Sequence, residues 1–176
     1  MRRRLLSLLM MLLAAGAAAQ EREQHEKEES AEAAKGTSAL APALKEAKVS
    51  LASGMRAAEK EGRPISGKFE LEDGKLQLSV YTMKGDKFSE VIVDHKTGKI
   101  AKSEPITGGD DLAAAQKQAE AMTKAKHSLR DVIAHAEKAN PGFHAVRAVP
   151  EIENGTAQAD VTLLKGTTSK SVDEPL

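Results

Sequence analysis

The sequence predicts an α+β protein that consists of two tandem repeats, each with one helix followed by three strands. Two observations predict this organisation. Matching segments recur in the same order 78 to 81 residues apart, which indicates that one structural unit occurs twice. Within each unit, apolar residues at helical spacing are followed by alternating or β-branched runs separated by turn dipeptides.

The first repeat is predicted over residues 39–102 and the second over residues 126–176. Most of the matches are helix starts and turns. An offset of 78 relates the helical segments and an offset of 81 relates the hairpin turns, so the second repeat has three extra residues between them. The matched pairs include Ala43 and Ala121, Ala47 and Ala125, Ser50 and Ser128, Leu51 and Leu129, Glu59 and Glu137, Gly74 and Gly155, and Gly85 and Gly166.

Each repeat begins with a predicted helix that a serine caps. Ser50 and Ser128 can accept hydrogen bonds from the free amides of the first turn, and Asp131 completes a short capping box in the second repeat. Segments 62–64 (GRP) and 140–142 (NPG) end the helices. The apolar stripes between these signals are Leu51, Met55 and Ala58, and Leu129, Val132, Ile133 and Ala136.

Strands follow each helix, and the turns between them predict antiparallel hairpins. Asp73-Gly74 fits a type I′ turn, which needs positive φ at both central positions. The predicted strands of the first repeat are Ile65–Leu71, Lys75–Met83 and Phe88–Asp94, with a short extension at Lys99–Ala101. Those of the second repeat are Phe143–Val149, Gly155–Leu164 and a truncated Lys170–Val172.

Residues 103–125 are predicted to join the repeats as a linker and an alanine-rich helix. The segment Ser103–Asp111 contains a proline and two glycines and is predicted to be a loop. A narrow apolar stripe then predicts a helix over Leu112–Ala125 that packs against one of the sheets. Residues 20–38 are highly charged and lack aromatic residues, which predicts a disordered tether.

The N-terminal residues have the order of a cleavable secretory signal. Three arginines follow Met1, an apolar run covers residues 5–13, and small residues cover 14–19. We therefore expect a signal peptide over residues 1–19, cut between Ala19 and Gln20. The alternative is a membrane anchor, which needs roughly 20 apolar residues. We expect a periplasmic or secreted mature protein without stable membrane insertion.

Composition argues against several function classes. Removing the three N-terminal arginines lowers the basic count from 26 to 23, against 26 acidic residues, so the mature net charge is about −3. With this charge and 2% aromatic residues, the chain has neither a basic stripe nor a stacking platform for nucleic acid. The absence of cysteine removes disulfides, thiol catalysis and thiolate metal sites.

The first repeat also has a specific order of motifs. A helix opens at Val49-Ser50-Leu51, a turn follows at Asp73-Gly74, and Val93-Asp94 precedes Lys96-Thr97-Gly98 near its end. In these motifs and their spacing the first repeat resembles a PepSY domain. The resemblance is weaker in the second repeat, which is divergent, is truncated and lacks the closing motif.

The resemblance implies that each repeat is a helix packed on a three-stranded antiparallel sheet, in an extracytoplasmic protein. Family members include propeptides of thermolysin-type metallopeptidases, where the domain is associated with inhibition, and free-standing exported proteins. The family pattern contains no catalytic residues, so the resemblance implies no active site here.

The histidines do not form a recognisable catalytic or metal motif. His127 and His135 are eight residues apart, too far for an i, i+4 chelating pair, and His25 lies alone in the tether. His95 is expected in a turn facing water, and His144 is expected to point outward at a strand start. We therefore predict no enzyme activity, no catalytic, cofactor-binding or metal-binding residues, and no cofactor.

The sequence leaves three hypotheses for function. The first is a non-enzymatic binding module for a protein or peptide partner, with inhibition or regulation of an exported peptidase as its narrower form. An exposed sheet edge, such as that of the truncated last strand, can take a peptide as an added strand. The second is a structural or accessory cell-envelope protein with no small ligand, whose small repeats cover each other's apolar faces. The third is an enzyme or metal protein. The oligomeric state does not follow from the sequence.

Overall fold

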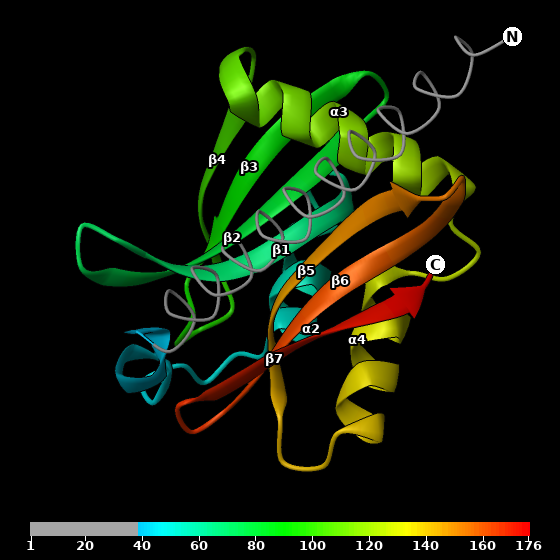
Figure 1. Cartoon of the computed structure of the whole chain (residues 1–176). Helices are drawn as coiled ribbons and strands as arrows, with labels where there is room; N and C mark the ends of the chain where they lie inside the picture. The colour runs from blue at the N-terminus through cyan, green and yellow to red at the C-terminus, as the bar shows by residue number, and fades with distance from the viewer. Residues whose placement is uncertain (1–38) are drawn as a thin grey trace, which may run out of the picture. The chain divides into compact units, whose positions relative to one another are not determined.

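The computed structural model describes residues 39–176, and all strands within them belong to one antiparallel sheet (Figure 1). The seven strands lie in the order β4-β3-β2-β1-β5-β6-β7. The strands are β1 Arg63–Glu72, β2 Lys75–Lys84, β3 Lys87–Val93, β4 Ile100–Ile106, β5 His144–Glu153, β6 Thr156–Lys165 and β7 Thr168–Pro175. The helices are α2 Leu51–Ala58, α3 Gly109–Lys124 and α4 Leu129–Ala139, and residues 39–44 are also helical.

The prediction of two separate three-stranded sheets is wrong, because β1 of the first repeat pairs with β5 of the second. Gly67 lies opposite Ala148, and Lys68 lies opposite Arg147. Each repeat alone would leave its first strand as an open edge with unpaired backbone groups. Pairing the two edges satisfies part of these groups and joins the repeats into one sheet.

An approximate two-fold axis passes between β1 and β5. Gly67 and Ala148 are equivalent residues at the repeat offset of 81, and they also lie opposite each other in the β1–β5 pair. The β1–β2 and β5–β6 hairpins have the same register, including an irregularity at equivalent positions. Asp73 and Asn154 both have φ of 49° before a glycine with positive φ, which is the turn geometry predicted from the sequence.

Both outer strands are longer than predicted. The predicted extension at Lys99–Ala101 overlaps the start of β4, which continues to Ile106 through residues predicted to be a loop. β7 is a strand of eight residues that pairs along β6, and it is not truncated to Lys170–Val172. Each strand contains proline and charged residues, which obscure the alternating pattern of a strand and are typical of sheet edges.

Helices α2 and α4 cover one face of the sheet and contact each other. A Cβ atom on Gly67 of β1 would lie 2.8 Å from Met55 Cε, so α2 approaches the central strand closely. One apolar core fills the space beneath these helices and includes residues of both repeats. Eight core side chains that are at most 1% exposed are Leu51, Met55, Ile65, Leu78, Val80, Ile133, Val161 and Leu163.

Helix α3 begins on the opposite face of the sheet and crosses it (Figure 1). Leu78 faces α2, so Tyr81, three residues further along β2, points to the other face. There Tyr81 Oη donates a hydrogen bond of 2.7 Å to Asp111, and burial together with this carboxylate raises the pKa of Tyr81. At the other end of α3, Arg63 Nη2 donates to the Met122 carbonyl at 3.0 Å. The helix presents mostly small residues to the protein: Ala115, Ala119, Ala121 and Met122.

Several predictions concern residues that the structure does not describe. The signal peptide, its cleavage between Ala19 and Gln20, the tether over residues 20–38, and His25 all lie outside residues 39–176. Within the described residues, the helices are too short or too polar to cross a membrane.

Candidate functional site

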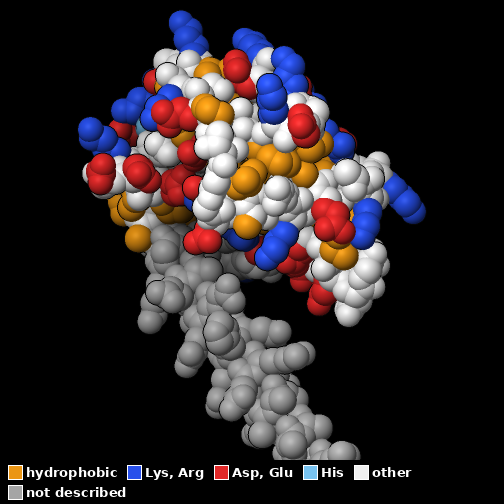
Figure 2. Space-filling model, turned by 90° about the horizontal axis from the view of Figure 1, so that it is seen from above, with side chains coloured by type: hydrophobic (Ala, Val, Ile, Leu, Met, Phe, Trp, Pro, Cys, Tyr) orange, Lys and Arg blue, Asp and Glu red, His pale blue; other side chains and the backbone are white. Residues whose placement is uncertain are grey.

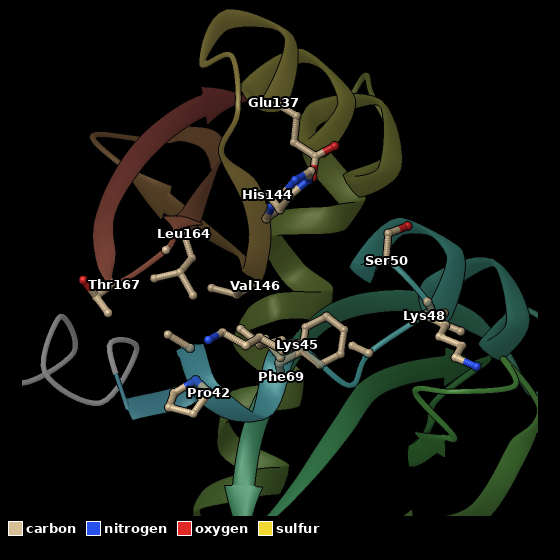
Figure 3. Close-up of a pocket in the computed structure, with 16 residues that line it drawn as sticks. Pro42, Lys45, Lys48, Ser50, Phe69, Glu137, His144, Val146, Leu164 and Thr167 are labelled. Atoms are coloured by element: carbon tan, nitrogen blue, oxygen red, sulfur yellow. The ribbon is translucent and has the colours of Figure 1, made fainter.

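An apolar cleft of about 570 Å³ opens on the face of the sheet that α2 and α4 cover (Figure 3). Residues 41–50, the end of α4, the start of β5 and the β6–β7 turn line it. Phe69, Val146 and Leu164 provide buried apolar surface. Its volume lies in the range of roughly 300–1,000 Å³ that is typical of ligand sites. The cleft is therefore the candidate site in the described part of the chain.

The N-terminal segment, residues 39–50, forms one wall of the cleft because the β3–β4 turn holds it. The backbone N–H groups of Lys48 and Val49 both donate to the carbonyl oxygen of His95, at 2.9 and 3.1 Å. Lys96 Nζ lies 2.7 Å from Glu46 Oε2. Both members of this ion pair are exposed, so the backbone hydrogen bonds contribute more to the position of the wall.

The turn at residues 94–98 belongs to the motif that resembles the PepSY family, and it has a structural role. Asp94 Oδ1 accepts hydrogen bonds of 2.8 Å from the N–H groups of Thr97 and Lys96. These two donors hold the pKa of the Asp94 carboxyl below its ordinary value. Gly98 has φ of 72°, a conformation that favours glycine. The motif therefore shapes the hairpin that positions the cleft wall.

Four ionisable side chains line the cleft: Lys45, Lys48, Glu137 and His144. Glu137 Oε1 accepts a hydrogen bond of 2.8 Å from the backbone N–H of Ala145. Lys45 and Lys48 have no ion-pair or hydrogen-bond partner for their ammonium groups among the described residues. Figure 3 shows Lys45 extended along the cleft, whereas the Lys48 side chain points away from it. Two lysines and one glutamate line the cleft, and none of the three has an ion-pair partner among the described residues.

A second cavity of about 300 Å³ occupies the equivalent position in the other half of the molecule. Its lining includes residues that the repeat offsets relate to lining residues of the cleft. The pairs, with the cleft residue first, are Leu44 and Met122, Ser50 and Ser128, Glu137 and Glu59, and His144 and Arg63. The two cavities are thus two copies of one feature.

Charged side chains form bridges beside the second cavity that the cleft lacks. Arg130 Nη2 lies 3.0 Å from Glu59 Oε1, and Arg63 donates to the Met122 carbonyl. The residue equivalent to Arg130 in the first repeat is Ala52, which cannot form the corresponding bridge. The cleft therefore lacks the Arg–Glu bridge of the second cavity.

The histidines have separate roles in the described structure. His135 Nδ1 lies 2.6 Å from Glu174 Oε2 and links α4 to β7. His144 is exposed, as predicted, and it also lines the cleft. The prediction that His95 faces water is only partly correct, because its side chain is half-buried and its Nδ1 is buried without a hydrogen-bond partner among residues 39–176. Among residues 39–176, no group of His, Asp and Glu side chains is arranged to hold a metal ion.

The face shown in Figure 2 mixes the two signs of charge. Lys and Arg side chains alternate with Asp and Glu side chains around an apolar patch. A nucleic-acid interface needs clustered basic residues. This face does not offer such a cluster.

Sequence reasoning did not find the cleft, because its walls come from segments far apart in the chain. Phe69, Val146 and Leu164 look like ordinary core residues of three strands. One signal was present: Ala43 and Ala47 match Ala121 and Ala125. This match makes the N-terminal segment equivalent to the end of α3. The N-terminal segment lines the cleft, and the end of α3 lines the second cavity.

Comparison of the chain with protein-family models, with curated proteins and with solved structures gives no match. The candidate site rests on the geometry and charges described above.

Proposed function

We propose that this chain is an exported, non-enzymatic, PepSY-like module that binds an apolar segment of a protein or peptide partner. The observation that carries the proposal is the open apolar cleft of about 570 Å³. A concave apolar surface with a few polar groups is typical of a binding site. Export is proposed from the sequence of residues 1–19, and the PepSY assignment from the motif at residues 93–98.

Inhibition or regulation of an exported peptidase is the narrower form of this proposal. The resemblance to PepSY domains supports it, since the domain is associated with peptidase inhibition. The cleft is a better contact surface than the sheet edges, because β4 and β7 both carry charged residues and a proline.

Cross-linking in the cell envelope tests the proposal by comparing the native chain with a variant whose cleft is partly filled. Three forms of the chain Gln20–Leu176 are compared: the native chain, Ala47→Phe and Ala125→Phe. Ala47 is a half-buried lining residue, so phenylalanine should fill part of the cleft. Ala125 is its equivalent in the second repeat and lies outside the cleft.

We expect mass spectrometry to identify an envelope protein cross-linked to the native chain and to Ala125→Phe, and lost from Ala47→Phe. If Ala47→Phe still captured the partner, the partner would bind the chain at a surface other than the cleft. A blank with all three forms would argue against the binding function and favour the second candidate.

The second candidate is a structural or accessory envelope protein with no small ligand, and the shared core favours it. The β1–β5 pairing and the contact between α2 and α4 make the two repeats parts of one packed unit. Deletion of the second repeat, residues 126–176, should then unfold the first repeat. Cooperative melting of the remaining chain at the native temperature would contradict this candidate.

A further inference from the structure

The two equivalent cavities differ in what fills them. In the smaller cavity, Met122 is only 2% exposed, and the paired Arg130 and Glu59 line the cavity with it. In the cleft, the equivalent residues are Leu44, which is half-buried, and Ala52. The chain therefore leaves a smaller space of about 300 Å³ in the second cavity and a larger one of about 570 Å³ in the cleft.

The unpaired ammonium group of Lys45 favours a negative group in the part of the cleft along which this side chain extends. Glu137 also lines the cleft, where its carboxylate accepts a hydrogen bond from the backbone of β5. The arginines of the smaller cavity are engaged, whereas Lys45 and Lys48 have no partner among residues 39–176. Ser50, the N-cap of α2, also lines the cleft and places the positive end of that helix beside it.

The size of the cleft favours the end of a chain over a continuous strand. Residues 41–50, α4 and the β6–β7 turn bound it, and its volume suits a small ligand (Figure 3). At a peptide C-terminus, an apolar side chain and a carboxylate are attached to the same Cα. This arrangement matches an apolar floor at Phe69 and Val146 with a lysine along the cleft.

We infer that the cleft binds the C-terminal end of its partner, with apolar side chains inside and the terminal carboxylate next to Lys45. This inference rests on the proposed binding function and specifies the chemistry of the partner. Lys45 is the main anchor because it extends along the cleft, and Lys48 contributes less because its side chain points away.

Isothermal titration calorimetry with two short peptides tests the inference. The probes are Ac-Ser-Ala-Phe-Leu with a free C-terminal carboxylate and the same peptide as its C-terminal amide, titrated into the chain Gln20–Leu176. We expect the free acid to bind about two- to fivefold more tightly, which is the range for an exposed ion pair. Added salt should reduce the difference, because it screens exposed charges.

Lysine variants locate the carboxylate. Lys45→Gln should remove the preference for the free acid, and Lys48→Gln should reduce it by a smaller factor. The matched control is Lys126→Gln, which replaces the exposed equivalent of Lys48 in the second repeat and should leave the preference unchanged. Circular dichroism melts of the variants verify that each remains folded.

Three outcomes would overturn the inference. Equal affinity for acid and amide, with both lost in Ala47→Phe, would reject carboxylate recognition and leave the binding function intact. Absence of binding by either peptide at millimolar concentration would also reject it, and the envelope cross-linking would judge the binding function independently. Displacement of the peptide by an equal concentration of decanoate would assign the cleft to fatty carboxylates.

Discussion

The first half of the sheet (β4-β3-β2-β1) and the second half (β5-β6-β7) share their hairpin turns and register but differ where a helix end meets the sheet. In the second cavity Arg130 spans to Glu59, and in the cleft Ala52 stands in place of Arg130. The two halves also have different residues at equivalent positions in the core, such as Gly54 and Val132, and between strands, such as Ser79 and Asp160. The comparison teaches that two copies of a unit can share one core while substitutions at a few positions give their equivalent cavities different sizes and charges.

The largest expected effect comes from the closest helix–sheet contact. A Cβ on Gly54 of α2 would lie 2.3 Å from Leu78 Cδ2, whereas the equivalent residue of α4 is Val132. We expect Gly54→Val to lower the free energy of unfolding by about 1–3 kcal/mol through overpacking, measured by urea denaturation. Arg56→Val, on the exposed side of α2, should cost less than about 0.7 kcal/mol. Equal losses would contradict close packing at Gly54.

A polar pair in the second half, of which only Glu174 is largely buried, replaces an apolar pair in the first. His135 and Glu174 are equivalent to Ala57 and Val93. We expect His135→Ala to lower the free energy of unfolding by about 1–3 kcal/mol, because it leaves a largely buried carboxyl group without its partner. The double variant His135→Ala, Glu174→Val recreates the apolar pair and should recover most of the loss in urea denaturation. A double variant as unstable as the single one would reject this explanation.

The helix caps offer a comparison of about 1 kcal/mol. Ser128→Ala should cost about 1 kcal/mol, and Ser50→Ala should cost less, because only the second half has a full capping box. Hydrogen bonds from Ser128 hold the pKa of Asp131 below its ordinary value of 3.8. Because the pKa of Asp131 is lowered in the folded state, the capping box stabilises the protein fully above the ordinary pKa. This stabilisation is lost as the pH falls through the lowered pKa. Thermal melts near neutral pH and at about pH 2 should show the gap between the two variants closing in acid, and a gap that persists would be evidence against the box.

The β3–β4 turn exists only in the first half, since β7 is the outer strand of the second. We expect Asp94→Ala to speed hydrogen exchange at the Lys48 and Val49 amides, because Asp94 orders the turn whose carbonyl they bond. The pKa of Asp94 is lowered, so its contribution is lost as the pH falls through that lowered value, and native exchange should then approach that of the variant. Asp86→Ala, in another exposed turn, is the control and should leave these amides unchanged.

The smallest effect is expected between β6 and β7. Asp160 and Asp173 lie opposite each other where the first half has Ser79 and Ile92. Burial, followed by the charges of Asp160 and Glu153, raises the pKa of Asp173. The raised pKa means that the ionised Asp173 carboxylate destabilises the folded state. Asp173→Asn removes this charge and should stabilise the protein near neutral pH by less than about 0.5 kcal/mol. Calorimetric melting should show this gain fading as the pH falls through the raised pKa, and destabilisation at neutral pH would contradict it.

Much of the secondary structure was predictable from nearby residues. The caps at Ser50 and Ser128, the hairpin turn at Asp73-Gly74 and the alanine-rich helix between the repeats all occur in the structure. β4 was not predictable, since its middle residues are polar and exposed and include Pro105. Edge strands bury little surface, so their sequences carry a weak apolar signal.

The sequence by itself determined the duplicated unit, the starts of its helices and the geometry of its hairpin turns, because these depend on residues a few positions apart. Only the tertiary structure decided that β1 and β5 join the repeats into one sheet, since Gly67 and Ala148 are separated by 81 residues. It also decided the cleft, where the N-terminal segment meets Leu164 near the other end of the chain. Such contacts arise from the packing of whole elements, and no local pattern of residues encodes them.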